Sequence, residues 1–427
     1  MGKDVTAIIE GFKSIKKEIK IPLGDLTILV GPPSSGKSNI LEALALLGYG
    51  IKIAIEASLK EYGETGPNDK LSSFIRGVTC FDYLNRFSSN RHAVVSLGSS
   101  SVKLLCEEEP WLAKLVLSIS NGENSRDIKE YVIDADLKPV YSLEQLDLLE
   151  GKSLDNILYL VYSLLLAQRE RITEKPYKII RTNSLSSVSG LEIIVPRLYG
   201  FDRLRAIDNI VRGKTGAFYP KSYLDEKARN IARLLYTRDD VLNKINQVLS
   251  ELCDMTIKPL SDGRLAFFDH KREIGPSSVS DSVIRIIYGY SALYLSEKKV
   301  LDLDNRASIS LRPLVMLEEP EAHMYPVAFS SLAEAVAEAI SRKSLVLITT
   351  HSGRLAQILW EEVLRKGYGS RVYYVYRDPS EGTVLYEVDM RQLATRLEDL
   401  DYIVHEHPGD VEQMLRDKIL QPLKTNT

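Results

Sequence analysis

Runs of consecutive apolar residues recur along the chain, and segments with helical periodicity follow them. The clearest run, residues 26–30, contains almost no polar position, which is typical of a strand buried on both faces. Residues 38–47 follow it, and their apolar side chains fall on one face of a helix. Towards the C-terminus, strands are predicted at 314–317 and 345–349, with an alanine-rich helix over 327–341 between them. Strands that alternate with helices predict an α/β fold with a parallel sheet.

The rest of the chain shows weaker patterns of both kinds. Short apolar stretches predict strands at residues 7–9 and 19–21, and two strands of an antiparallel meander at 93–95 and 102–105. Helical periodicity from about residue 141 to 251 predicts helices over 155–171, 223–236 and 241–253, and a serine-rich loop over 182–190. Later patterns predict a helix over 283–295, a hairpin of 372–376 with 384–388 across a turn at 379–382, and a closing helix over 410–420.

Composition narrows the class of protein. The 427 residues are 44% hydrophobic and 26% charged, which argues against disorder as the main theme. No apolar run reaches the roughly 18 residues that a membrane helix needs, and no leader pattern opens the chain. The three cysteines, Cys80, Cys106 and Cys253, are widely spaced, which argues against a disulfide framework and a cysteine-based zinc site. We therefore expect a cytoplasmic protein without a membrane partner.

Charge is distributed unevenly. The chain has a net charge of −3, so its overall charge does not favour binding to nucleic acid. Residues 164–242, however, carry 15 Lys and Arg against 9 Asp and Glu, a net charge of +6, which leaves −9 for the rest. Solvated helix faces would also produce such a stretch. The alternative is that this basic middle contacts a negatively charged partner.

The strongest chemical signal lies between the first buried strand and its helix. Residues 31–38 match GxxxxGK[ST], and a strand before and a helix after are the context that this motif requires. Backbone N–H groups of such a loop face nucleotide phosphates, Lys37 places its charge on the β- and γ-phosphates, and Ser38 offers an oxygen to Mg²⁺. The candidate nucleotide-binding residues are Gly31, Pro32, Pro33, Ser34, Ser35, Gly36, Lys37, Ser38 and Asn39.

Acidic residues follow the strand at 314–317. Glu318 stands at the strand's tip, where one carboxylate can hold a water of Mg²⁺, a cation that prefers oxygen ligands. Glu319 points elsewhere and is the candidate base for the attacking water. An acidic helix start would give a similar pattern, but the P-loop earlier in the chain favours catalysis.

A histidine follows the third buried strand. Because the carboxyl ends of parallel strands meet at one edge of a sheet, His351 is expected near the P-loop, where it can bond the γ-phosphate. His323 is a weaker candidate. His405 and His407 flank Glu406, and an exposed turn is favoured there over a metal site.

Together these motifs resemble the ABC-class ATPases of the SMC, RecF and overcoming-lysogenization-defect (OLD) type. The matching segments cover roughly residues 1–50 and 275–390, in the right order and spacing: Gly11 to Ser14, the P-loop with the helix after it, the extended Walker B of residues 317–326, and Thr350 to Ser352. The resemblance implies a P-loop NTPase with a split ABC-type head, a mixed sheet plus an antiparallel meander, and a largely helical insertion. It also implies an ATPase that uses ATP and Mg²⁺, with Lys37, Glu319 and His351 as catalytic residues.

The family's signature motif, which contacts the nucleotide of an opposing subunit, has its best match at residues 278–282. Ser282 stands where a glycine is expected, so its side chain adds bulk beside the phosphate. Ser280 and Ser282 can still cap the next helix and face an anion. No Q-loop glutamine occurs between residues 81 and 103, which argues against a transporter motor.

The resemblance also suggests how the chain is divided. We expect an ATPase N-lobe over 1–130, a largely helical basic insertion over 131–260, and a C-lobe over 261–427. The insertion lacks the heptads of a coiled-coil arm, so RecF-like or OLD-like proportions fit better. Only 76 residues follow His351, without a metal-binding acidic cluster, so no nuclease domain is expected.

Two functions remain open at this point. The first is an ATP-dependent homodimer that acts as a switch on duplex DNA through the insertion, in repair, chromosome maintenance or defence. The second is a regulatory ATPase that binds only protein, such as a separate nuclease, toxin or other effector chain. The basic residues that would test the first are Arg203, Arg205, Arg212, Lys214, Lys221, Arg229 and Arg233.

Overall fold

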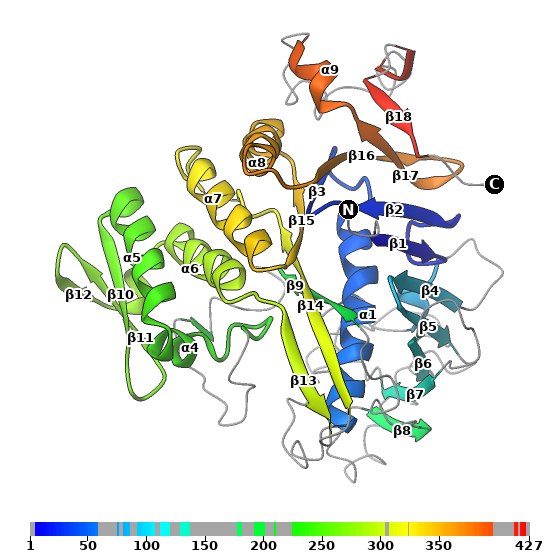
Figure 1. Ribbon diagram of the computed structural model, residues 1–427, viewed down its shortest axis with the longest axis horizontal. Coiled ribbons are helices and arrows are strands. Elements are labelled where there is room, and N and C mark those ends of the chain that lie inside the picture. The colour runs from blue at the N-terminus through cyan, green and yellow to red at the C-terminus, as the bar shows by residue number, and fades with distance from the viewer. Residues whose placement is uncertain are drawn as a thin grey trace, which may run out of the picture.

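The three predicted buried strands lie side by side in one sheet (Figure 1). The structure is a computed structural model. It describes residues 5–58, 75–76, 80–85, 92–106, 112–119, 129–136, 177–181, 192–200, 209–210, 224–303, 307–322, 324–395, 414–416 and 419–423. The predicted helix at 155–171 and the serine-rich loop at 182–190 lie outside these residues.

The main sheet has eight strands and a parallel centre. β3 (Leu26–Val30) lies between β15 (Leu345–Thr350) and β16 (Ser370–Asp378), and β14 (Ala307–Glu318) pairs with the far edge of β15. β9 (Glu192–Tyr199) pairs in parallel with β14. The antiparallel strands that complete the sheet are β13 (Lys299–Leu303), β17 (Gly382–Val388) and β18 (Leu420–Pro422). The mixed α/β sheet expected of a P-loop NTPase is therefore confirmed.

A second sheet is antiparallel; it contains the two strands predicted for a meander and the two short strands predicted at 7–9 and 19–21. Its order is β2-β1-β4-β5-β6-β7-β8. The bounds are β1 (Val5–Glu10), β2 (Ile19–Leu23), β4 (His92–Leu97), β5 (Ser100–Cys106), β6 (Leu112–Ile119), β7 (Lys129–Asp136) and β8 (Tyr177–Arg181).

The helix α1 (Lys37–Ser58) lies between the two sheets (Figure 1). It is apolar all round, as a helix covered on every side must be, and its residues from Ile40 to Ala54 carry only two charges. Gly48 lets α1 lie directly against β9, because a Cβ at this position would lie 2.1 Å from the carbonyl oxygen of Pro196. Farther along, Lys52 forms an ion pair of 3.8 Å with Glu226. The backbone carbonyl of Glu226 accepts a hydrogen bond from Tyr288.

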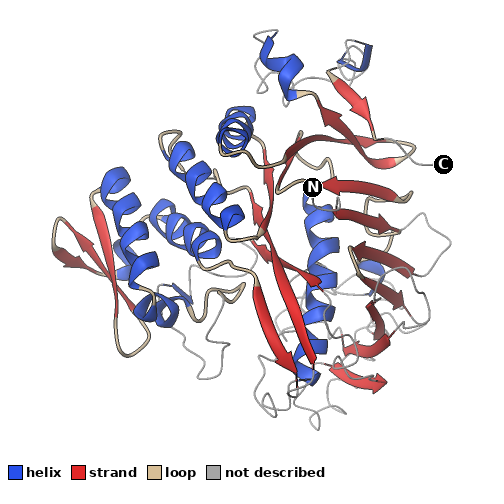
Figure 2. Cartoon of the chain, viewed as in Figure 1, coloured by secondary structure: helices blue, strands red, loops and turns tan. Residues whose placement is uncertain are grey.

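Helices cover the opposite face of the main sheet. α6 (Asp281–Tyr294), α7 (Ala328–Ser341) and α8 (Gly353–Arg365) pack there, and α5 (Asp239–Cys253) packs on α6. α4 (Ile231–Thr237) and a three-stranded sheet, β10 (Met255–Pro259), β11 (Leu265–Asp269) and β12 (Arg272–Ile274), flank α5 (Figure 2). The short elements η3 (Cys80–Asp82), η7 (Pro276–Ser278) and α9 (Met390–Thr395) complete the list.

Several predicted elements differ in extent. α1 continues 11 residues beyond the predicted end at residue 47. The helix predicted over 223–236 begins only at Ile231, because Ala228 before it has a φ of +57°, which is incompatible with a helix. The described part of residues 131–260 contains β8, β9 and β10 as well as helices. Residues 420–422, where a helix was predicted to end, form β18.

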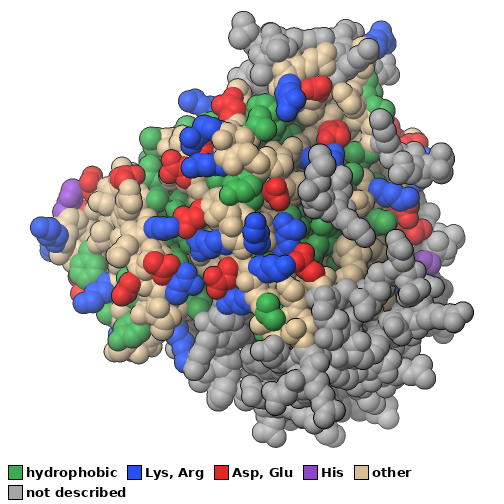
Figure 3. Space-filling view, in the orientation of Figure 1, with side chains coloured by type: hydrophobic (Ala, Val, Ile, Leu, Met, Phe, Trp, Pro, Cys, Tyr) green, Lys and Arg blue, Asp and Glu red, His purple; other side chains and the backbone are tan. Residues whose placement is uncertain are grey.

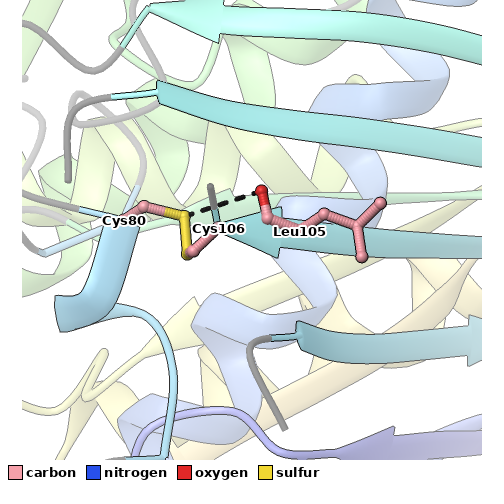
Figure 4. Close-up of a disulfide and its surroundings, with 3 residues drawn as sticks. All are labelled: Cys80, Leu105 and Cys106. Carbon is pink, nitrogen blue, oxygen red and sulfur yellow. Dashed lines mark hydrogen bonds between the residues drawn. A yellow bond between two sulfur atoms is a disulfide. The ribbon is translucent and has the colours of Figure 1, made fainter. Parts of the chain in front are cut away.

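One disulfide corrects the expectation from cysteine spacing. Cys80 in η3 and Cys106 at the end of β5 are joined, with 5.7 Å between their Cα atoms (Figure 4). Cys80 Sγ also lies 3.9 Å from the carbonyl oxygen of Leu105. Both cysteines are buried, whereas Cys253 is a free thiol. Spacing did not reveal the pair, because the turn at residue 80 reaches β5 only through the tertiary fold.

The helices of the described ranges contain no candidate for a membrane span, since none is both long enough and apolar enough.

Candidate nucleotide site

The P-loop connects β3 to α1 and encloses the side chain of Lys37. Lys37 is only 4% exposed, and its Nζ donates hydrogen bonds to the carbonyl oxygens of Gly31 at 2.8 Å and Pro32 at 2.9 Å. Burial lowers the pKa of Lys37 to about 8, although the carboxylates of the Walker B segment act in the opposite direction. The loop therefore holds the lysine ammonium against two of its own carbonyl oxygens.

Backbone geometry explains the two glycines of this loop. Gly31 has a φ of +148° and Gly36 a φ of +107°, values that disfavour other residues. A Cβ at Gly36 would lie 2.2 Å from Thr383 Oγ1, and one at Gly31 would lie 2.3 Å from the carbonyl oxygen of Val375. Strands β16 and β17 thus press directly against the loop, so its shape depends on residues more than 300 positions away.

A small cluster of hydrogen-bonded polar side chains packs against the P-loop. Asn39 Nδ2 donates to Ser14 Oγ at 2.6 Å, and that oxygen lies 2.6 Å from Thr383 Oγ1. Thr383 Oγ1 also donates to the carbonyl oxygen of Ser35 at 3.4 Å. Asn39 thus bonds a residue that supports the loop, and its contact with a nucleotide stays a prediction. The Ser35 hydroxyl is buried without a hydrogen-bond partner in the described part of the chain.

The Walker B segment reaches the P-loop through a histidine. Nε2 of His351 lies 2.9 Å from Glu319 Oε1, and Nδ1 of the same ring lies 3.5 Å from Lys37 Nζ. Both contacts are satisfied by a neutral imidazole that donates from Nε2 and accepts from lysine at Nδ1. The three residues predicted to be catalytic, from three separate strand ends, form one continuous chain of contacts.

The backbone at Glu319 is unusual. Its φ is +44°, which is uncommon for a residue with a Cβ, and its N–H donates to the carbonyl oxygen of Thr349 at 3.0 Å. This conformation turns the chain sharply after β14. The sharp turn fits the separate roles expected for the two carboxylates.

Glu321 is a further site residue, to which the sequence pattern assigned no role. Its Oε1 accepts hydrogen bonds from Thr350 Oγ1 at 2.6 Å and from the backbone N–H of His351 at 2.8 Å. Burial raises the pKa of this carboxyl. The sequence shows a carboxylate three residues after the end of β14. It does not show that this carboxylate bonds Thr350 and His351 on the loop after β15.

The donor set fits Mg²⁺. Ser38 and Glu318 are partly exposed oxygen donors, and the carboxylates of Glu318, Glu319 and Glu321 are close enough to act on Lys37 electrostatically. The described residues contain no cluster of three or more His, Cys, Asp or Glu that could hold a metal alone. Mg²⁺ in phosphate sites commonly takes one or two protein oxygens and completes its shell with water and phosphate, so these residues suit it.

The signature-like segment lies at the start of α6. Ser280 is the N-cap of this helix, but its side chain is exposed and makes no capping hydrogen bond. Ser282, in the first turn, is partly exposed. The predicted helix after the segment is present, whereas the assignment of Ser280 and Ser282 to a nucleotide stays a prediction. His323, His405 and His407 lie outside the described residues.

One family model matches the chain. Residues 202–355 match the family described as "AAA domain, putative AbiEii toxin, Type IV TA system", a range that includes the signature-like segment, Glu318, Glu319 and His351. Over this range the chain is similar to AAA domains, and its mixed sheet fits the P-loop NTPase fold. The match begins after the P-loop, so it does not include the N-terminal strands and α1.

Solved structures of SMC heads are distantly similar to this chain. The SMC head domain from Thermotoga maritima is 15% identical, with a TM-score of 0.36, and the alignment covers 90% of this chain and 98% of that one. An Smc head bound to the C-terminal winged-helix domain of ScpA is 13% identical with a TM-score of 0.40, covering 91% and 98%. A Pyrococcus furiosus Smc head bound to the C-terminal domain of ScpA is 14% identical with a TM-score of 0.40, covering 92% and 98%. No curated protein matches the sequence.

Proposed function

We propose that the protein binds ATP with Mg²⁺, hydrolyses it to ADP and phosphate, and uses this cycle to control an ATP-dependent homodimer that acts on duplex DNA. The observation that carries the proposal is the chain of contacts from Lys37 through His351 to Glu319. It joins a phosphate-binding lysine, a phosphate-sensing histidine and a general base within one polar site.

Binding begins with Lys37. Its ammonium leaves the carbonyl oxygens of Gly31 and Pro32 and contacts the β- and γ-phosphates, while N–H groups at the start of α1 bond phosphate oxygens. Ser38 and Glu318 would hold Mg²⁺, which neutralises phosphate charge when bound. The cost of burying a charged lysine is then offset by an adjacent anion.

Hydrolysis uses Glu319 and His351. Glu319 accepts a proton from the attacking water as the water oxygen bonds to the γ-phosphorus. The bond from that phosphorus to the β–γ bridging oxygen breaks, and its electron pair leaves with ADP. His351 turns its Nε2 proton from Glu319 towards a γ-phosphate oxygen, so the imidazole reports whether the phosphate is present.

The DNA role is supported by the basic stretch at 164–242. Five of its seven test residues lie outside the described ranges. Of the other two, Arg229 forms a two-pronged ion pair with Asp225 and is mostly buried, whereas Arg233 is exposed. Arg229 is therefore a structural residue, and Arg233 is the better probe of DNA binding. The face in Figure 3 mixes basic and acidic side chains, so it shows no single-sign surface.

A second function is favoured by one observation. The description of the matching family names a toxin of a toxin–antitoxin system. In this version the ATPase controls a partner protein, such as a nuclease or other effector chain, and DNA neither binds nor stimulates turnover.

Sedimentation of the Glu319→Gln protein with labelled duplex DNA, in ATP or in ADP, separates these proposals. We expect a dimer in ATP only, with DNA sedimenting alongside it in a salt-dependent manner. A dimer that leaves the DNA behind supports the protein-partner function. A monomer in both nucleotides contradicts ATP-dependent dimerisation. Arg233→Glu, combined with Glu at Arg203, Arg205 and Arg212, should remove DNA binding without changing ATP binding.

A further inference from the structure

The loop that carries His351 is fastened to the Walker B loop at two places. Glu319 N–H bonds the carbonyl oxygen of Thr349, which joins the two loops at the strand ends. Beyond the strands, the carboxylate of Glu321 crosses to the histidine loop and bonds both Thr350 Oγ1 and the backbone N–H of His351. Only the second fastening includes the histidine itself.

The neighbouring hydrogen bonds show how much of the loop Glu321 controls. The Thr350 hydroxyl donates to Glu321 and accepts from the backbone N–H of Ser352 at 2.9 Å. The Ser352 hydroxyl in turn caps α8 by accepting from Leu355 N–H at 3.2 Å. One carboxylate oxygen therefore anchors a continuous network that runs from the Walker B loop, through the histidine loop, into the first turn of α8.

This anchor matters because the imidazole must satisfy two partners at once. Its contacts to Lys37 and Glu319 come from opposite nitrogens of one ring, at 3.5 and 2.9 Å. With the backbone N–H of His351 held, the ring position depends only on its own side-chain rotations. Without that bond the N–H must find water, and the loop can tilt away from both partners.

We propose that Glu321 is the positioning residue for His351: by accepting hydrogen bonds from Thr350 and from the His351 backbone, it sets where the imidazole lies relative to Glu319 and the γ-phosphate. This inference rests on the proposed ATPase function. It depends on Glu321 as a hydrogen-bond acceptor rather than on its charge, since Oε1 makes both bonds, while Oε2 is buried without a hydrogen-bond partner in the described part of the chain.

Steady-state ATPase measurements on matched variants test the inference. Glu321→Ala should lower kcat by about ten- to a hundredfold with little change in KM, the range expected when a reacting group is displaced by about 1 Å. Glu321→Gln keeps an acceptor oxygen and should stay within about threefold of the wild type. Thr350→Val should be slow and Thr350→Ser normal, because only serine keeps the hydroxyl. The control is Glu334→Ala, at an exposed position on α7, the helix that follows the same loop.

A double-mutant cycle separates positioning from general loosening. If Glu321 acts through the histidine, the Glu321→Ala, His351→Ala double variant should be no slower than His351→Ala alone. Multiplied losses, or a Glu321→Gln protein as slow as Glu321→Ala, would overturn the inference.

A nucleotide-free readout keeps this test apart from the proposed function. The ring resonance of His351, assigned by its loss in His351→Gln, should move in Glu321→Ala and Thr350→Val but stay in place in Glu321→Gln and Glu334→Ala. An unmoved resonance in Glu321→Ala refutes the positioning role even if ATP is hydrolysed. A wild-type protein that hydrolyses no ATP refutes the proposed function, while the resonance still decides the role of Glu321.

Discussion

Two segments of this chain precede a helix and face an anion in the proposed cycle, yet they are built differently. The P-loop before α1 is enclosed: Lys37 is buried, and strands β16 and β17 press on its glycines. The segment 278–282 before α6 is largely exposed, and its N-cap Ser280 makes no side-chain capping bond. The helix after it is packed, with every residue from Val283 to Tyr294 buried, and Val279 of the segment packs against the same core.

This difference between the P-loop and residues 278–282 indicates which of the two segments is fully supported by its own chain. The P-loop has its shape before any ligand arrives, since its supports are Ser14, Asn39 and Thr383 of the same chain. The signature-like segment is largely exposed, although Val279 packs against the core, so its exposed residues are accessible to another molecule. Changes in the P-loop should therefore affect nucleotide binding, whereas changes at 278–282 should affect association alone.

The largest expected effect is that of Lys37→Ala, which should abolish ATP binding, because no other charge in the loop can replace the ammonium. Calorimetric titration with ATP measures this, with Lys366→Ala at an exposed site as the control. Tight ATP binding by Lys37→Ala would contradict the assignment of the P-loop.

Glu319→Gln should retain ATP binding and lower turnover by at least about 10²-fold, because the amide cannot accept the proton of the attacking water. Phosphate release under single-turnover conditions gives the rate. Turnover near the wild-type rate would show that another group acts as the base.

The signature-like segment offers changes in both directions. Ser280→Ala should weaken ATP-driven dimerisation by about tenfold, while Ser282→Gly should strengthen it by removing bulk near the partner's phosphate. ATP affinity at concentrations too low for dimerisation should stay unchanged in both. If either variant changed the affinity of the monomer for ATP, residues 278–282 would affect nucleotide binding as the P-loop does, which contradicts the comparison.

The smallest effect concerns pH. Because burial lowers the pKa of Lys37 to about 8, the free protein loses this charge as pH rises through that value. ATP affinity at pH 8.5 should then be about fourfold weaker than at pH 7, if only the charged lysine binds. Binding at pH 8.5 should also take up protons, since the phosphates raise the lysine pKa. Titration in buffers of different ionisation enthalpy detects this uptake, and proton release would contradict it.

The motifs and the parallel core could be predicted because each is local. A buried strand, a glycine loop and a helix are consecutive in sequence, so their order already placed Lys37, Glu319 and His351 at one edge of a sheet. The length of α1 was underestimated because Gly48 and Gly50 are normally helix-weakening residues. In the structure, tertiary packing outweighs this weak helix preference, since the backbone of β9 occupies the space beside Gly48.

Other features depend on contacts between distant positions. β9 was missed partly because Pro196 argues against a strand. Within the described residues, however, β9 pairs only with β14, and an edge strand tolerates proline. The bond between Glu321 and His351 spans 30 residues, and the Cys80–Cys106 pair spans 26. Sequence order reveals neither of these contacts.

The ion pair between Lys52 of α1 and Glu226 connects α1 to a distant part of the chain. Lys52 lies 15 residues beyond Lys37, about 22 Å along a straight helix, so a tilt of about 3° at the P-loop end would displace Lys52 by about 1 Å. Glu226 receives that displacement through its carboxylate and is bonded through its backbone carbonyl to Tyr288 on α6. The Lys52–Glu226 ion pair thus connects α1, which begins at the P-loop, through Glu226 to α6, the helix that follows the signature-like segment.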